Sequence, residues 1–119
     1  MRDYHKLEIW RRAHALAINV HDVARALRGG QFAALRSQLT RAADSVATNI
    51  VEGSGAASAR EFARFLDVSI KSTSETEYHL LSARDRKALA DRRYHELASE
   101  AVAIRRMTYA YRKRLLEES

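Results

Sequence analysis

The chain has 119 residues and a mass of 13.5 kDa, which is enough for one domain with a single hydrophobic core. Its formal net charge of +6 and sequence pI near 10.1 favour an acidic partner such as nucleic acid. Cysteine is absent, which excludes disulfides and thiol nucleophiles, and with no apolar run of about 18 residues and no apolar N-terminal leader we expect a cytoplasmic protein without a membrane span.

The first predicted helix spans residues 6–28. Proline is absent and glycine occurs only four times, so little interrupts helical structure. Gly29 and Gly30 follow the helix and allow the left-handed backbone that commonly ends one. Apolar residues repeat at spacings of four and three, as in helices that pack nearly parallel or antiparallel. They are Ile9, Ala13, Leu16, Val20, Val23 and Leu27.

The second and third predicted helices span 32–52 and 59–88. Gly53 is expected to end the second, and Ser58 with Glu61 forms the S-x-x-E capping box that begins the third. The stripe of the second helix contains Leu35, Leu39, Ala42, Val46 and either Asn49 or Ile50. That of the third contains Phe62, Phe65, Leu66, Ile70, Leu80 and Leu81. Its middle is rich in small polar residues that favour close helix packing, namely Ser69, Ser72, Thr73, Ser74 and Thr76.

The fourth predicted helix spans 92–117, with Asp91 as its N-cap. Its stripe again alternates spacings of four and three: Leu97, Ala101, Ile104, Thr108, Tyr111 and Leu115. Four amphipathic helices with short connections predict an all-α, antiparallel up-down four-helix bundle that forms one domain over residues 1–119.

No catalytic or metal-binding set is complete in the sequence. Glu75 and His79 lie one turn apart, and His14 and His21 share a helix face, but neither pair has a third ligand. The segment 53–58 precedes a helix N-terminus that could hold an anion, although a tight turn is the favoured interpretation. We therefore predict a non-enzymatic protein without catalytic residues, metal or cofactor.

The last predicted helix carries the most concentrated positive charge. Arginine pairs with phosphate and tyrosine stacks on unpaired bases, and Tyr109 and Tyr111 lie among the cations, so this helix is the predicted nucleic-acid site. The alternative is a solvated face on which arginines pair with neighbours such as Glu96 and Glu100. The predicted binding residues are Arg92, Arg93, Arg105, Arg106, Arg112, Lys113 and Arg114.

The segment 37–55, SQLTRAADSVATNIVEGSG, resembles the signature of the 23S rRNA intervening-sequence proteins, a family of small four-helix bundles. Its pattern Q-L-x-R-A-x-x-S-I-x-x-N-I-x-E-G is matched at Gln38, Leu39, Arg41, Ala42, Ser45, Val46, Asn49, Ile50, Glu52 and Gly53. Leu7, Trp10 and Ala13 match an N-terminal L-x-x-W-x-x-A pattern. Ser54-Gly55-Ala56 departs from the family, which has a basic residue after the E-G turn.

The resemblance implies a homo-oligomer, a pentamer, that binds nucleic acid as an accessory protein, with RNA favoured over DNA. The alternative function is a homo-oligomeric scaffold or protein-interaction module that contacts a protein partner and no nucleic acid. We expect a structural role for the motif residues, with Asn49 and Ser45 bonding across the bundle and Gly53 turning the chain. These motif residues are Gln38, Arg41, Ser45, Asn49, Glu52 and Gly53.

Overall fold

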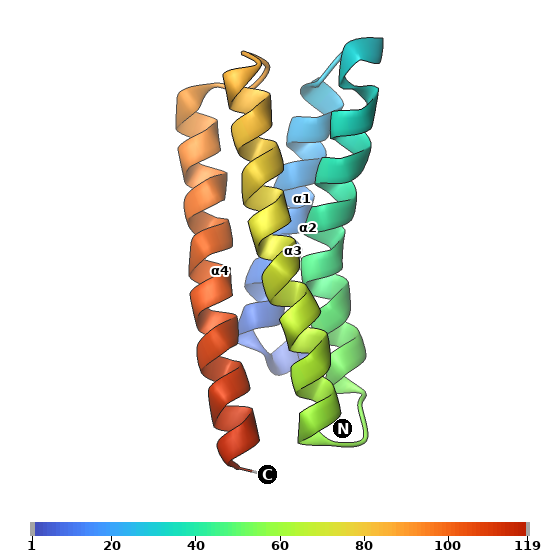
Figure 1. Cartoon of the computed structure of the whole chain (residues 1–119), viewed down its shortest axis with the longest axis vertical. Helices are drawn as coiled ribbons and strands as arrows, with labels where there is room; N and C mark the ends of the chain where they lie inside the picture. The colour runs from blue at the N-terminus through green and yellow to red at the C-terminus, as the bar shows by residue number, and fades with distance from the viewer. Residues whose placement is uncertain (1, 119) are drawn as a thin grey trace.

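The computed structural model describes residues 2–118 as a bundle of four α-helices, with no strand among them (Figure 1). The bundle is 48 Å long and 22 × 19 Å across. The helices are α1 (Glu8–Ala26), α2 (Ala33–Ser54), α3 (Ala59–Asp85) and α4 (Asp91–Glu117), and two 3-10 turns precede α1 and α2, namely η1 (Tyr4–Lys6) and η2 (Gly30–Phe32). The predicted all-α four-helix bundle is confirmed. Within the described part of the chain, no helix is both long and apolar enough to cross a membrane.

Helices that follow one another in the chain run in opposite directions (Figure 1). The ion pairs between α3 and α4 show this, because Glu77 contacts Arg105 whereas the earlier Asp67 contacts the later Arg112. The Arg2 N–H donates to the carbonyl oxygen of Ser54 and so ties the start of the chain to the end of α2. The arrangement is therefore up-down, as the short connections predicted.

The four predicted apolar stripes meet in one core. Ile50 is fully buried whereas Asn49 is half-buried, so the α2 stripe continues through Ile50. Tyr111, Phe65 and Leu81 are half-buried at the margin of the core. Leu16, Leu27, Leu39, Ile50, Leu66, Leu80 and Ile104 supply the largest fully buried aliphatic side chains. Apolar residues spaced alternately four and three positions apart thus identify the buried face of a helix.

Several predicted helix ends differ from the structure, and the third helix ends at Asp85 rather than at residue 88. The first helix stops at Ala26, and Leu27 is already extended with a φ of −81° and a ψ of 91°, so no glycine caps it. Gly29 instead has a φ of 97° and leads into η2. Asp91 is the first residue of α4 and the N-cap is Ala90, which has no side-chain oxygen to accept a bond. The C-cap of α1 therefore lies two residues before Gly29, and the N-cap of α4 lies one residue before Asp91.

The predicted cap of α3 is present. The Ser58 side-chain oxygen accepts a hydrogen bond from the backbone N–H of Glu61 at 3.1 Å. Because this bond satisfies an otherwise free helix N–H, Ser58→Ala should lower the free energy of unfolding by about 1 kcal/mol, measured by urea denaturation. Ser58→Asp keeps an acceptor and should retain most of the stability. Equal stability of the alanine and aspartate variants would contradict this role.

Gly53 does not end α2, which continues to Ser54. A Cβ at this position would lie 2.6 Å from Cδ1 of Phe62 and 2.9 Å from Cβ of Phe65. The expectation that Gly53 turns the chain is therefore wrong. Its missing side chain allows α2 to lie directly against the first turns of α3.

Candidate nucleic-acid interface

Small polar residues bring α2 and α3 together. Ser69 is fully buried and its hydroxyl donates to the carbonyl oxygen of Val46 at 2.8 Å, while the Ser72 hydroxyl donates to Oγ of Ser45 at 2.8 Å. The buried hydroxyl of Thr76 donates to the carbonyl oxygen of Ser72 in its own helix. These contacts agree with close packing as the role of the polar segment of α3.

The amide of Asn49 bonds within its own helix. Its Nδ2 donates to the carbonyl oxygen of Ser45 at 2.9 Å and to the Ser45 hydroxyl at 3.0 Å. The expected bond from Asn49 across the bundle is therefore absent, and the link to α3 runs from Ser45 to Ser72. Asn49 orients the serine that makes the contact between helices.

The other motif residues lie on the solvent side of this contact. Gln38, Arg41 and Ser45 of α2 line an open polar groove of about 280 Å³ together with Ser72, Glu75 and His79 of α3. Glu52 is exposed. Within residues 2–118, no group of three His, Asp or Glu side chains is placed to hold a metal ion.

The seven predicted binding cations of α4 do not share one surface. Arg92 and Arg93 lie in the first turn, and Arg93 donates to Oδ1 of Asn19 in α1 at 3.2 Å. Arg114 lies over the Tyr111 ring, with 5.9 Å from its guanidinium carbon to the ring centroid, and lines a pocket beside α1. Of the remaining four, Arg105 and Arg112 contact carboxylates of α3, Lys113 lines a shallow groove of α4 with Tyr109 and Arg112, and Arg106 is exposed on α4.

Two of these four cations are held by carboxylates of α3. Nη1 of Arg105 is 3.0 Å from Oε1 of Glu77, and Nε of Arg112 is 2.7 Å from Oδ1 of Asp67. Both arginines are paired, but with carboxylates of α3 and not with the α4 neighbours that the alternative named. Of those neighbours, Glu96 pairs with Arg93, and Glu100 pairs with Arg12 of α1. Arg106 and Lys113 are exposed, and neither has an ion pair among residues 2–118.

Three further cations of α3 extend this surface and were missed in the sequence. Arg60, Arg64 and Lys71 are exposed, lie on one helix face at spacings of four and seven, and have no ion pair in the described chain. Arg60 and Arg64 line an open groove of about 650 Å³ with Arg112 of α4. Their spacing of four and seven residues indicates one helix face and could have identified them. They were missed because the net charge of residues 51–91 is −1.

Exposed aromatic rings lie on the same two helices. The side chains of Tyr78 and Tyr109 are 63% and 57% exposed, and Tyr78 continues the spacing of seven from Arg64 and Lys71. Tyr111 is not available in this way, because it is half-buried with its ring 5.7 Å from that of Phe62. We define the α3–α4 face as Arg60, Arg64, Lys71, Tyr78, Arg105, Arg106, Tyr109, Arg112 and Lys113.

A sequence model of the 23S rRNA-intervening sequence protein family matches residues 5–110. The chain belongs to this family. A crystal structure from Bacteroides thetaiotaomicron, described as a protein of unknown function from the S23 ribosomal protein family, has the same fold. It is 21% identical, with a TM-score of 0.82, and the match covers 88% of this chain and 98% of that one. No curated protein matches the sequence.

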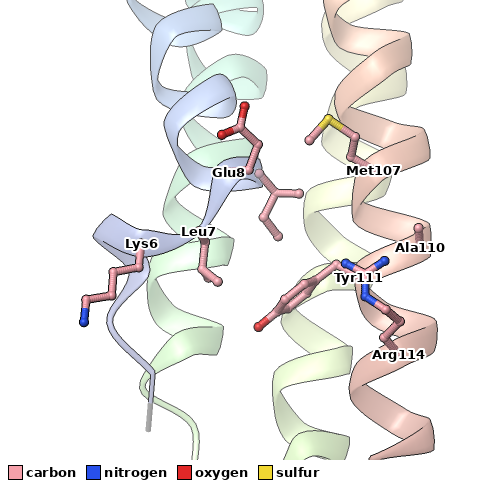
Figure 2. Close-up of a pocket in the computed structure, with 8 residues that line it drawn as sticks. Lys6, Leu7, Glu8, Met107, Ala110, Tyr111 and Arg114 are labelled. Atoms are coloured by element: carbon pink, nitrogen blue, oxygen red, sulfur yellow. The ribbon is translucent and has the colours of Figure 1, made fainter.

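In this member of the 23S rRNA-intervening sequence protein family, the pocket lined by Arg114 lies between the start of α1 and α4 (Figure 2). It has a volume of about 410 Å³, with Leu7 and Met107 on opposite sides and the Tyr111 ring between the two helices. The Tyr111 hydroxyl is buried and has no well-formed hydrogen bond within the described chain. Burial raises the pKa of this phenol above 10.0, and the nearby guanidinium of Arg2 only partly opposes the rise.

The raised pKa makes Tyr111 a source of alkaline instability. The folded-state pKa lies above the unfolded-state value of about 10. Its contribution to stability is therefore complete below that pH and is lost as the pH rises through the folded-state pKa. Relative to Tyr111→Phe, the unmodified chain should lose urea resistance as the pH rises from about 9 through about 11. A stability difference that stays constant over this range would contradict the assignment.

Proposed function

We propose that the protein is a non-enzymatic accessory protein that binds nucleic acid, with RNA as its ligand, and that it acts as a homo-oligomer in the cytoplasm. The observation that carries the proposal is the α3–α4 face. In the described chain, α3 and α4 have three exposed carboxylates without an ion pair, namely Glu61, Glu75 and Glu117. Against these, the face gathers two exposed tyrosines and five cations without an ion pair among residues 2–118: Arg60, Arg64, Lys71, Arg106 and Lys113.

The face has the dimensions and chemistry of a phosphate track. Residues 60 to 78 of α3 extend for about 27 Å at 1.5 Å per residue, which is several nucleotides of backbone. Free arginine and lysine side chains release counterions when they bind phosphate, which is the main source of affinity for a nucleic acid. The family description, which refers to 23S rRNA, supports RNA as the ligand.

The binding test is fluorescence polarisation with labelled RNA over a series of salt concentrations. We expect binding at low salt that weakens steeply as salt is added, because counterion release drives it. Absence of binding to RNA and DNA at low salt would contradict the proposal. If the protein then captured a partner protein from nuclease-treated cytosol, the scaffold function would replace it.

The oligomer is a separate part of the proposal. A ring of copies repeats the α3–α4 face, so that a modest affinity per copy becomes a high avidity along one RNA. Light scattering coupled to gel filtration should give the mass of a pentamer, five times 13.5 kDa. A monomer mass at micromolar concentration would contradict assembly but leave binding by the single face open to the polarisation test.

A further inference from the structure

We infer that the α3–α4 face selects single-stranded nucleic acid over duplex, by stacking unpaired bases on Tyr78 and Tyr109. The inference rests on the proposed function and names the ligand class that this face takes. It concerns features shared by RNA and DNA single strands, namely exposed base faces and a flexible phosphate backbone.

The two tyrosines lie at different heights on neighbouring helices. The contacts Glu77–Arg105 and Asp67–Arg112 set the register of the antiparallel pair. In this register Tyr109 lies level with the residues near Lys71, and Tyr78 lies beyond Arg105. The rings are therefore separated by roughly seven residues, or about 10 Å, along the bundle. Bases from nearby nucleotides of one strand can reach both rings.

These two rings are the ones left open. Tyr109 has no ring or cation neighbour within residues 2–118, and Tyr78 has only the tilted ring of His79 at 5.6 Å. The remaining tyrosines are engaged: Tyr94 has the guanidinium of Arg84 over its ring at 4.5 Å, and Tyr4 stacks on His5 at 4.1 Å. Two large rings exposed among cations are the combination that stacks bases while the cations hold the backbone.

A duplex cannot use these rings. Its bases are stacked on one another and only backbone and groove edges face outward, so an exposed tyrosine on a helix surface meets sugar and phosphate. The fixed pairs of Arg105 and Arg112 also reduce the net charge that a duplex would meet on this face. Base stacking on the tyrosines is therefore the interaction that distinguishes single-stranded from duplex nucleic acid.

The experiment compares single-stranded RNA, single-stranded DNA and duplex RNA of one sequence, each at the same low salt. We expect the unmodified protein to bind either single strand at least about tenfold more tightly than the duplex. The double variant Tyr78→Leu/Tyr109→Leu should lose at least about 25-fold in single-strand affinity, with duplex affinity unchanged. The matched control Tyr78→Phe/Tyr109→Phe keeps both rings and should retain single-strand binding.

A strand that contains 2-aminopurine reports stacking directly. Its fluorescence should change on binding to the unmodified and phenylalanine proteins and not on binding to the leucine protein. Equal affinity for strand and duplex, together with unchanged binding by the leucine variant, would overturn the inference and leave the proposed function intact. No binding of any strand or duplex would instead refute the proposed function. A leucine variant with lower oligomer mass and intact single-strand binding would assign the rings to a subunit contact and overturn the inference.

Discussion

Replacing Gly53 with leucine is expected to lower the free energy of unfolding by roughly 3 kcal/mol. The first atom of the new side chain would already lie 2.6 Å from the ring of Phe62, which is only 3% exposed. The ring cannot move outward without opening the core, so α2 and α3 must separate. Urea denaturation followed by circular dichroism measures the loss.

The matched control for this substitution is Gly55→Leu. Gly55 is exposed and has an ordinary φ of −89°, and a Cβ at this position would lie 3.6 Å from its nearest neighbour, the Glu52 carbonyl oxygen. This variant should stay within about 0.5 kcal/mol of the unmodified chain. Equal stability of the two leucine variants would show that the approach of α2 to α3 tolerates a side chain at position 53.

Neutralising four free cations of the α3–α4 face is expected to lower affinity for single-stranded RNA by about 100-fold at moderate salt. If all four contact phosphate, the slope of log K against log salt should become shallower by about 2.8, because each lost contact contributes about 0.7 for a single strand. The four substitutions, each to glutamine, are at Arg60, Arg64, Arg106 and Lys113.

A control variant with the same change in net charge separates the effect of the position of the cations from the effect of the total charge. Its four cations are also exposed and free of ion pairs in the described chain, but lie outside the face: Lys6, Arg28, Lys87 and Arg92. Their replacement by glutamine should change the slope by less than about 1. If both variants lost the same affinity, binding would depend on overall charge and no particular face would be the interface.

The fold followed from short-range patterns that tertiary contacts did not override. The spacing of Ile9, Ala13 and Leu16 identifies a buried face because the helix repeat projects these positions onto one side. Helix ends were less predictable. Gly53 has the local signature of a cap, but its role depends on Phe62 of the next helix, and nothing within α2 records that contact.

The candidate interface was only partly predictable for the same reason. Whether an arginine is free or paired depends on its neighbours in space, and the partner of Arg105 is 28 residues away in the chain. Counting charge by segment also separated Arg60 and Arg64 from Arg112 of α4, with which they line one groove in the folded protein. The exposure of Arg106 and Lys113 could be predicted without knowledge of tertiary contacts, because both lie on the solvent side of the predicted helix.

Photo-cross-linking of the full-length protein to single-stranded RNA that contains 4-thiouridine tests the central claim most directly. Mass spectrometry of the digested complex identifies the peptides that contact the bases. We predict cross-links within residues 60–78 of α3 and 105–117 of α4, with Tyr78 and Tyr109 among the modified side chains. Cross-links confined to α1 and α2 would contradict the assignment of the α3–α4 face as the nucleic-acid interface.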